Sequence, residues 1–152
     1  MPQQPEVPLD GLYGDLVMDH YRHPHNRALI SEADIEAEEF NPFCGDRAAL
    51  QIKLDGQGKV CNVSARSEGC SIIQAATSML SDMLPGKSLC ELTAIAERFR
   101  ASMYNGTGDD TEGLGDLLAL QVVRRYPVRI KCALLPLVAL EEGIKAYHSK
   151  AG

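Results

Sequence analysis

The sequence predicts an α+β domain in which a three-stranded antiparallel sheet is packed on one face by several helices. Apolar side chains alternate with polar ones through residues 47–54 and 59–67, which is the two-residue period of strands with one solvated face. From residue 71 onward the apolar residues recur every three or four positions, as in amphipathic helices. Strands followed by a run of helices are typical of a sheet that is covered on one side.

The length and composition indicate one globular domain. With 152 residues, of which 45% are hydrophobic and 24% charged, the chain can bury one sizeable core but is short for two. Residues 1–8 contain three prolines among polar neighbours, and we expect them to be disordered. The single domain should therefore span residues 9–150.

Charge and hydropathy disfavour two classes of partner. A net charge of -6 is unsuited to binding nucleic acid, which requires a concentrated basic surface. The longest apolar run, residues 132–140, is far shorter than a membrane span, and no basic and apolar signal segment opens the chain. Five cysteines at irregular spacing argue against a disulfide framework, so we expect a protein of the reducing cytoplasm.

A first helix is expected from its N-cap at Asp10 to the residues before Pro24, because apolar residues recur between them at helical spacing. The end of this helix concentrates His20, His23 and His25, three of the four histidines. A metal site is one interpretation of this cluster. Because Pro24 interrupts the helical spacing, we favour a polar helix end that carries surface imidazoles.

Three strands should follow. Residues 35–40 are the weakest candidate because they are rich in glutamate, whereas residues 47–54 alternate clearly. Residues 55–58, with two glycines, predict a turn into a third strand at residues 59–67. Cys61 falls on the apparent core face of that strand, so we interpret it as a buried, inert thiol.

The next two helices have clear boundaries in the sequence. The apolar stripe of residues 71–84 ends at a Pro-Gly pair. Ser88 and Glu91 form a capping box for the following helix, in which Cys90 is interpreted as a packing residue. Residues 105–110 lack the spacing of a calcium loop, and we interpret them as a flexible turn.

Two further helices complete the chain. Leucines and valines at residues 114–122 predict a short helix that is halted by Pro127. A broad apolar face predicts a last helix over about residues 133–147. Pro136 should lie in its first turn, where a helix accepts proline.

Three cysteines and one aspartate are candidates for a shared metal site. Cys44 and Asp46 lie in one turn, while Cys70 and Cys132 each stand directly before a predicted helix, whose free amides favour a thiolate. Three soft sulfurs and one hard oxygen suit a thiophilic metal such as zinc, held less tightly than by four sulfurs. Cys44, which lies between a proline and a glycine, should be the most mobile of these ligands.

The spacing alone leaves other interpretations open. The four residues could bind a structural zinc that only stabilises the fold, although the sequence has no Cys-x-x-Cys pair. The cysteines could also be buried separately. A cysteine hydrolase with Cys44 as nucleophile and His20 or His148 as base is a further alternative that no local signature supports.

Four motifs together resemble the iron-sulfur cluster assembly proteins of the IscU/NifU type. They are LYGDLVMDHY at residues 12–21, NPFCGD at 41–46, EGCSI at 68–72 and RIKCA at 129–133. The resemblance extends from about residue 12 to residue 147 and is strongest to the SufU branch. Lys131 precedes the third cysteine where IscU scaffolds carry histidine, and the segment between Cys70 and Cys132 is extended as in SufU proteins.

The resemblance implies an IscU/SufU-like fold and a role in iron-sulfur cluster assembly. Zinc would be bound through Cys44, Asp46, Cys70 and Cys132, and Cys44 would accept persulfide sulfur from a SufS-type cysteine desulfurase. The sulfur would pass to the SUF cluster-assembly machinery or to apo iron-sulfur proteins, so the protein would be at most a sulfurtransferase. The alternative is a scaffold that assembles and transfers a transient [2Fe-2S] cluster on the same residues. Lys131 disfavours the scaffold because the neighbouring histidine ligand is absent.

Overall fold

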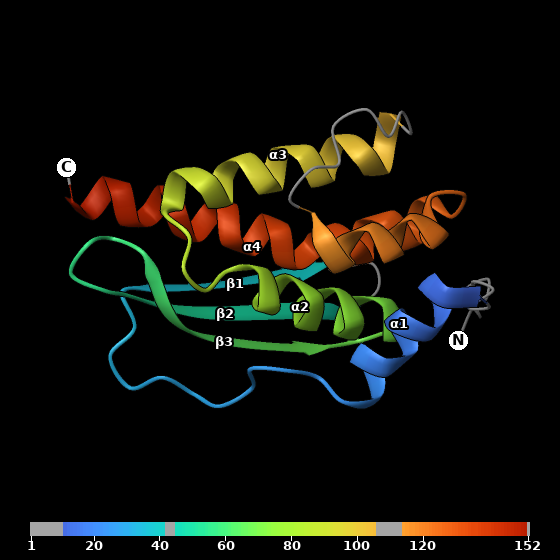
Figure 1. The fold of residues 1–152 in the computed structure, drawn as a ribbon, viewed down its shortest axis with the longest axis horizontal. Coiled ribbons are helices and arrows are strands. Elements are labelled where there is room, and N and C mark those ends of the chain that lie inside the picture. Colours follow the sequence, from blue (N-terminus) through green and yellow to red (C-terminus); the bar gives the residue numbers. More distant parts are fainter. Residues whose placement is uncertain (1–10, 42–44, 106–113, 152) are drawn as a thin grey trace.

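The computed structural model describes residues 11–41, 45–105 and 114–151, and it confirms the predicted α+β architecture (Figure 1). The antiparallel sheet has the order β1-β2-β3, built from β1 (Ile35–Asn41), β2 (Asp46–Leu54) and β3 (Val60–Glu68). Helices cover one face of this sheet (Figure 1). The weakest strand candidate of the sequence is β1, whose backbone pairs with β2 despite its acidic side chains.

The register of the sheet aligns apolar residues in rows beneath the helices. Ile52 in the central strand pairs with Ile35 on one side and with Val63 on the other, and all three are buried. Leu50, two residues earlier, pairs with Ala65 in the same way. Side chains at alternate positions of β2 are more exposed, as the two-residue period predicted.

The prediction that Cys61 is buried is wrong, because the hairpin contains a bulge. Lys53 pairs with Asn62 and Leu54 pairs with Val60, so Cys61 has no partner of its own in the ladder. An extra residue of this kind shifts the following side chains to the opposite face of the strand. Cys61 is therefore exposed, while Val60 on its other side is buried.

Two helices lie directly on the sheet. α2 (Ser71–Met83) packs on β3, and α4 (Pro127–Ala151) packs on β1 and β2. The remaining helices pack on these two: α3 (Leu89–Asn105) on α4, and both α1 (Gly11–Arg22) and η1 (Gly115–Val123) on α2. This arrangement leaves α2 in the middle of the helical layer (Figure 1).

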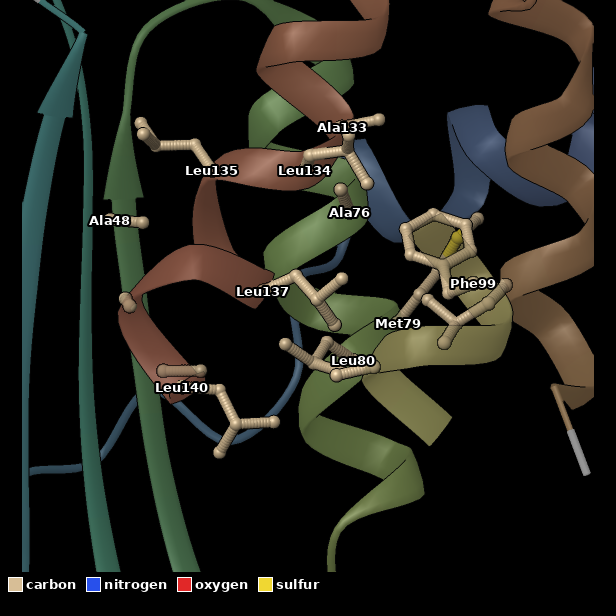
Figure 2. Packing of buried hydrophobic residues seen from close by; sticks show 14 of the residues in the cluster. Ala48, Ala76, Met79, Leu80, Phe99, Ala133, Leu134, Leu135, Leu137 and Leu140 are labelled. Atoms are coloured by element: carbon tan, nitrogen blue, oxygen red, sulfur yellow. The ribbon is translucent and has the colours of Figure 1, made fainter. Parts of the chain in front are cut away.

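The core between α2 and α4 consists of large aliphatic side chains and one aromatic ring. Figure 2 shows Leu80 of α2 next to Leu137 of α4, and Met79 of α2 next to the ring of Phe99 of α3. Each of these four side chains is at most 1% exposed. Burial of a side chain of this size contributes about 1.5–3 kcal/mol. The packing therefore holds α2 and α4 in a defined position relative to the sheet.

The boundary between α2 and α3 confirms the predicted capping box. The Ser88 amide donates a hydrogen bond to Glu91 Oε1 at 3.1 Å, and the Glu91 amide donates one to Ser88 Oγ at 3.2 Å. The interpretation of Cys90 as a packing residue is wrong, since this side chain is exposed. It lies in the first turn of α3 between the buried Leu89 and the exposed Glu91, on the solvent side of the helix.

The short helix predicted at residues 114–122 is present as the 3₁₀ helix η1, which ends before Pro127, but the predicted start of the last helix near residue 133 is wrong. Pro127 is the first residue of α4, a position at which the missing N–H would be unpaired in any residue. Pro136 lies inside the helix rather than in its first turn. Having no N–H, Pro136 cannot donate a hydrogen bond to the carbonyl of Cys132, four residues earlier. Because α4 begins at Pro127, Cys132 lies within this helix and does not precede it, contrary to the prediction.

The prediction of a polar helix end with surface imidazoles is wrong for His20. This residue is only 2% exposed, because α1 packs its last turns against α2 and η1. His23 and His25 follow the end of α1 and are exposed, as predicted.

Some predictions concern residues outside the described part of the chain. These are the disordered lead-in of residues 1–8, the N-cap Asp10 and most of the turn at residues 105–110. The extent of the domain, residues 9–150, stays a prediction. No helix in the described ranges is both long enough and apolar enough to cross a membrane.

The packing of Gly143 of α4 against β1 can be tested by substitution. A Cβ atom added at Gly143 would lie 2.8 Å from Ile35 Cγ2 and 3.0 Å from Ala37 Cβ. We expect Gly143→Ala to lower the free energy of unfolding by about 1–3 kcal/mol through overpacking, although alanine favours a helix. Urea unfolding monitored by circular dichroism measures the change. Glu142→Ala, an exposed neighbour, is the control and should stay within about 0.5 kcal/mol of the wild type.

Candidate metal centre

The ends of three elements bring Asp46, Cys70 and Cys132 together. Asp46 is the first residue of β2, Cys70 is the N-cap of α2, and Cys132 is the sixth residue of α4. Each offers one ligand atom, a carboxylate oxygen or a Sγ, and these atoms lie within 4.8 Å of one another. Cys44, the fourth predicted ligand, lies outside the described residues, two positions before Asp46.

Both oxygens of the Asp46 carboxylate accept hydrogen bonds from the other two residues. The Cys132 thiol donates to Oδ2 with an Sγ–O distance of 2.9 Å, and the Cys70 amide donates to Oδ1 at 3.3 Å. Asp46 is 2% exposed and Cys132 is fully buried, whereas Cys70 is half-buried. The carboxylate is thus oriented by two elements distant in sequence, and access from solvent is on the side of Cys70.

Gly69 provides the space that Asp46 occupies. Its φ of +134° is a backbone conformation that L side chains rarely adopt. A Cβ atom at this position would lie 2.0 Å from Asp46 Oδ1. No role was predicted for Gly69 from the sequence, although a glycine directly before a candidate ligand is a signal that could have suggested one.

The environment gives the two thiols different proton affinities. The pKa of Cys70 is lowered to about 6, chiefly by the neighbouring Cys132 thiol, with further contributions from the Ile73 amide and the charge of Arg129. The pKa of Cys132 is raised, because the neighbouring Cys70 thiolate, the burial of the group and the hydrogen bond to the Asp46 carboxylate all disfavour a second negative charge. Cys70 therefore forms a thiolate more readily than Cys132.

This donor set fits a zinc ion. Two sulfur ligands and a carboxylate oxygen are typical of thiophilic divalent metals and unsuited to magnesium or calcium, which prefer oxygen ligands. A divalent ion would replace the hydrogen that the Cys132 thiol donates to Asp46. The described part of the chain thus supplies three converging ligands, and one more would complete a tetrahedral set.

Two basic residues of α4 flank the centre. Arg129 contributes to the lowered pKa of Cys70, and its Nη1 is buried with no hydrogen-bond partner among the described residues. Lys131, next to Cys132, is exposed. It lines a groove of about 340 Å³ between α3 and α4 with the exposed aromatic side chains of Phe40 and Tyr104. The groove that includes Lys131, the sequence neighbour of Cys132, is therefore partly apolar and basic.

Comparison with protein families gives one match that covers nearly the whole chain. The family described as the NifU-like N terminal domain matches residues 12–152. Among curated proteins, the zinc-dependent sulfurtransferase SufU of Bacillus subtilis is 40% identical over 136 residues, which cover 90% of this chain and 91% of that protein. The iron-sulfur cluster assembly scaffold protein IscU of Streptococcus pyogenes is 35% identical over 138 residues, covering 90% of this chain and 85% of that one.

Solved structures of similar proteins share the fold. A crystal structure from Fervidobacterium islandicum, described as an iron-sulfur cluster assembly scaffold for the SUF system, has a TM-score of 0.78 and 30% identity, and the match covers 85% of this chain and 93% of that one. The N-terminal part of a NifU-like protein from Brucella abortus has a TM-score of 0.82 over 91% of this chain and 95% of that one. At 20% identity the latter supports the fold alone.

Substitution of Gly69 tests whether Asp46 is a ligand. In Gly69→Ala the new methyl group would displace the Asp46 carboxylate. We expect zinc affinity to fall at least about tenfold, as is typical when a group that positions a metal ligand is changed. Competition with a chromophoric chelator measures the affinity. Gly58→Ala is the matched control, because Gly58 also has a positive φ, +78°, but open space around it. Equal zinc affinities in the two variants would contradict a role for Asp46.

The lowered pKa of Cys70 predicts a pH-dependent reactivity. In the folded, metal-free protein, alkylation of Cys70 by iodoacetamide should reach half of its maximal rate near pH 6, because the thiolate forms above its pKa of about 6. In the urea-unfolded chain the midpoint should rise toward about 8.5. Peptide mass spectrometry gives the rate for this cysteine alone. Zinc should protect Cys70 in the folded protein. Equal midpoints in the folded and the unfolded chain would contradict the proposed effect of Cys132 on the pKa of Cys70.

Proposed function

This chain belongs to the family of NifU-like N-terminal domains, and we propose that it is an iron-sulfur cluster assembly protein that accepts sulfur in a zinc-dependent reaction. The observation that carries the proposal is the convergence of Asp46, Cys70 and Cys132 within 4.8 Å. The 40% identity to a zinc-dependent sulfurtransferase supports it. The free thiols of these cysteines are consistent with a reaction in the reducing cytoplasm, where we place the protein.

The proposed ligands of the zinc are Cys44, Asp46, Cys70 and Cys132. When bound, zinc would keep the sulfur ligands as thiolates, which are the nucleophilic form of cysteine. With three thiolates and one carboxylate the centre would carry a net charge of about -2, which weakens the hold on each sulfur. The neighbouring Arg129 would offset part of this charge.

Cys44 is the proposed sulfur acceptor, and the donor is a persulfide on a cysteine desulfurase of the SufS type. The Cys44 thiolate attacks the terminal sulfur of the donor persulfide, the S–S bond of the donor breaks, and the donor cysteine leaves as a thiolate. Cys44 then carries the persulfide, and no external oxidant or reductant is consumed. The sulfur would pass to the SUF cluster-assembly machinery or to an apo iron-sulfur protein.

The described residues of the centre would support this transfer in different ways. Asp46, Cys70 and the buried Cys132 would hold the ion, and the Cys70 amide keeps the Asp46 carboxylate oriented. The exposed rings of Phe40 and Tyr104, beside Lys131, offer an apolar and basic surface close to the centre. Such a surface suits a protein donor, whose contact would exclude water from the reacting sulfurs.

A second candidate function is that of a scaffold on which a [2Fe-2S] cluster is assembled as cargo and then transferred. The 35% identity to an IscU scaffold favours it, as do cysteine ligands combined with one aspartate. Lys131 argues against it, because an ammonium group cannot replace a histidine ligand. We therefore rank sulfur acceptance first.

The acceptor role is tested with Cys44→Ala. We expect this variant to lose persulfide formation and the stimulation of a SufS-type desulfurase, because the nucleophile is missing. Sulfide release from cysteine and mass spectrometry of the persulfide measure both effects. Cys61→Ser, which removes an exposed thiol away from the centre, is the control and should retain both. Stimulation that survives Cys44→Ala would refute the assignment.

The alternatives predict different outcomes for the same protein. Anaerobic reconstitution with iron and sulfide that yields a coloured, transferable [2Fe-2S] cluster would support the scaffold instead. If Asp46→Ala lowers the melting temperature but leaves sulfur transfer intact, the metal has a structural role only.

A further inference from the structure

A second group of metal-ligating side chains lies away from the Cys/Asp centre. His20 is near the end of α1, His25 lies in the segment that follows, and Asp82 is in the last turn of α2. Each offers one ligand atom, and these three atoms also lie within 4.8 Å of one another. The histidines are close together in the sequence, but Asp82 follows His25 by 57 residues and has no local signal that connects it to them.

The group is held in place by hydrogen bonds from α2. Ser78 Oγ lies 2.8 Å from His20 Nδ1 and accepts a hydrogen bond from the His25 amide at 2.9 Å, so one side chain positions both histidines. The two imidazole centroids are 4.6 Å apart. Asn26 Nδ2 donates to Asp82 Oδ1 at 3.0 Å, while Asp82 Oδ2 lies 2.6 Å from His25 Nδ1. The ligand atoms are thus pre-positioned rather than carried by free surface side chains.

Burial and charge suit the entry of a cation. The His20 side chain is 3% exposed, whereas those of His25 and Asp82 are 42% and 38% exposed, so the group has a buried inner ligand and an open outer side. Asp116 Oδ2 of η1 lies 3.6 Å from His20 Nε2 and adds a second carboxylate. With neutral imidazoles the group carries a net negative charge, which attracts cations.

We propose that His20, His25 and Asp82 form a second divalent-metal site, distinct from the Cys/Asp centre, for zinc or another cation that prefers imidazole ligands. Two nitrogens and one carboxylate suit zinc, nickel, cobalt or copper and not calcium or magnesium. The ion replaces the proton that His25 and Asp82 share across 2.6 Å. Ligand atoms around a tetrahedral zinc are about 3.4 Å apart. The His25 Nδ1 and Asp82 Oδ2 atoms, now 2.6 Å apart, would therefore separate slightly when the ion takes the place of the proton between them.

The two sites have separate ligand sets at opposite ends of α2. Cys70 caps the start of the helix and Asp82 lies in its last turn. At about 1.5 Å of rise per residue, these two positions are about 18 Å apart along the helix. Occupation of one site therefore requires no ligand of the other, and each can be tested alone.

The test is a titration of the full-length protein, already loaded with one equivalent of zinc at the Cys/Asp centre, with further Zn²⁺ by isothermal calorimetry. We expect the wild type to bind a second equivalent and His25→Gln to bind it at least about tenfold more weakly. His148→Gln removes an exposed histidine of α4 and should leave the second equivalent unchanged. Asp82→Asn, which keeps the side-chain volume, should weaken it as His25→Gln does.

Imidazole signals in long-range proton and nitrogen correlation spectra identify the residues that bind. His20 and His25 should shift with the second equivalent and His148 should not. A wild type that binds only one equivalent overturns the proposal, as does equal weakening by His25→Gln and His148→Gln. The Cys/Asp centre and sulfur transfer should be intact in His25→Gln, so failure of this proposal is distinguishable from failure of the proposed function.

Discussion

The hydrogen bond from the Cys132 thiol to the Asp46 carboxylate joins α4 to β2 across 86 residues of sequence, and the geometry of the metal centre depends on it. A buried carboxylate is costly unless its oxygens are paired. Here one oxygen accepts from Cys132 and the other from the Cys70 amide at the start of α2. The same contacts that satisfy the charge therefore place two sulfurs beside it. Gly69 completes the arrangement, since any side chain there would occupy the position of the carboxylate.

The α2 helix carries residues of both groups of metal-ligating side chains. Its start carries Cys70 of the Cys/Asp centre, and its end carries Asp82 beside two histidines. Between them the helix packs on β3. Met79 and Leu80, fully enclosed between α3 and α4, hold it in position (Figure 2). The two groups differ in softness, because thiolates and imidazoles rank divalent metals differently. One rigid element thus supports two donor sets that need not compete for the same ion.

Much of the fold was predictable because its signals are local. The alternating pattern of residues 47–54 and the capping box at Ser88 depend only on neighbours in sequence, and the structure confirms both. The errors occurred where distant packing decides between locally permitted states. A proline is acceptable both after a helix and at its first position, so Pro127 alone could not indicate which applies. Cys61 is exposed because of a bulge in the pairing of β2 and β3 at Lys53 and Leu54, which no periodic pattern reveals.

The sequence by itself determined the types of ligand, through its cysteines and Asp46, and the family to which these motifs belong. Only the tertiary structure decided which of the described residues meet. It placed Cys132 within a helix, raised the pKa of this thiol, and buried His20 next to a carboxylate from another helix. The physical reason is that donor chemistry belongs to single side chains, whereas proton affinity and ligand geometry arise from burial and from contacts between segments far apart in the chain.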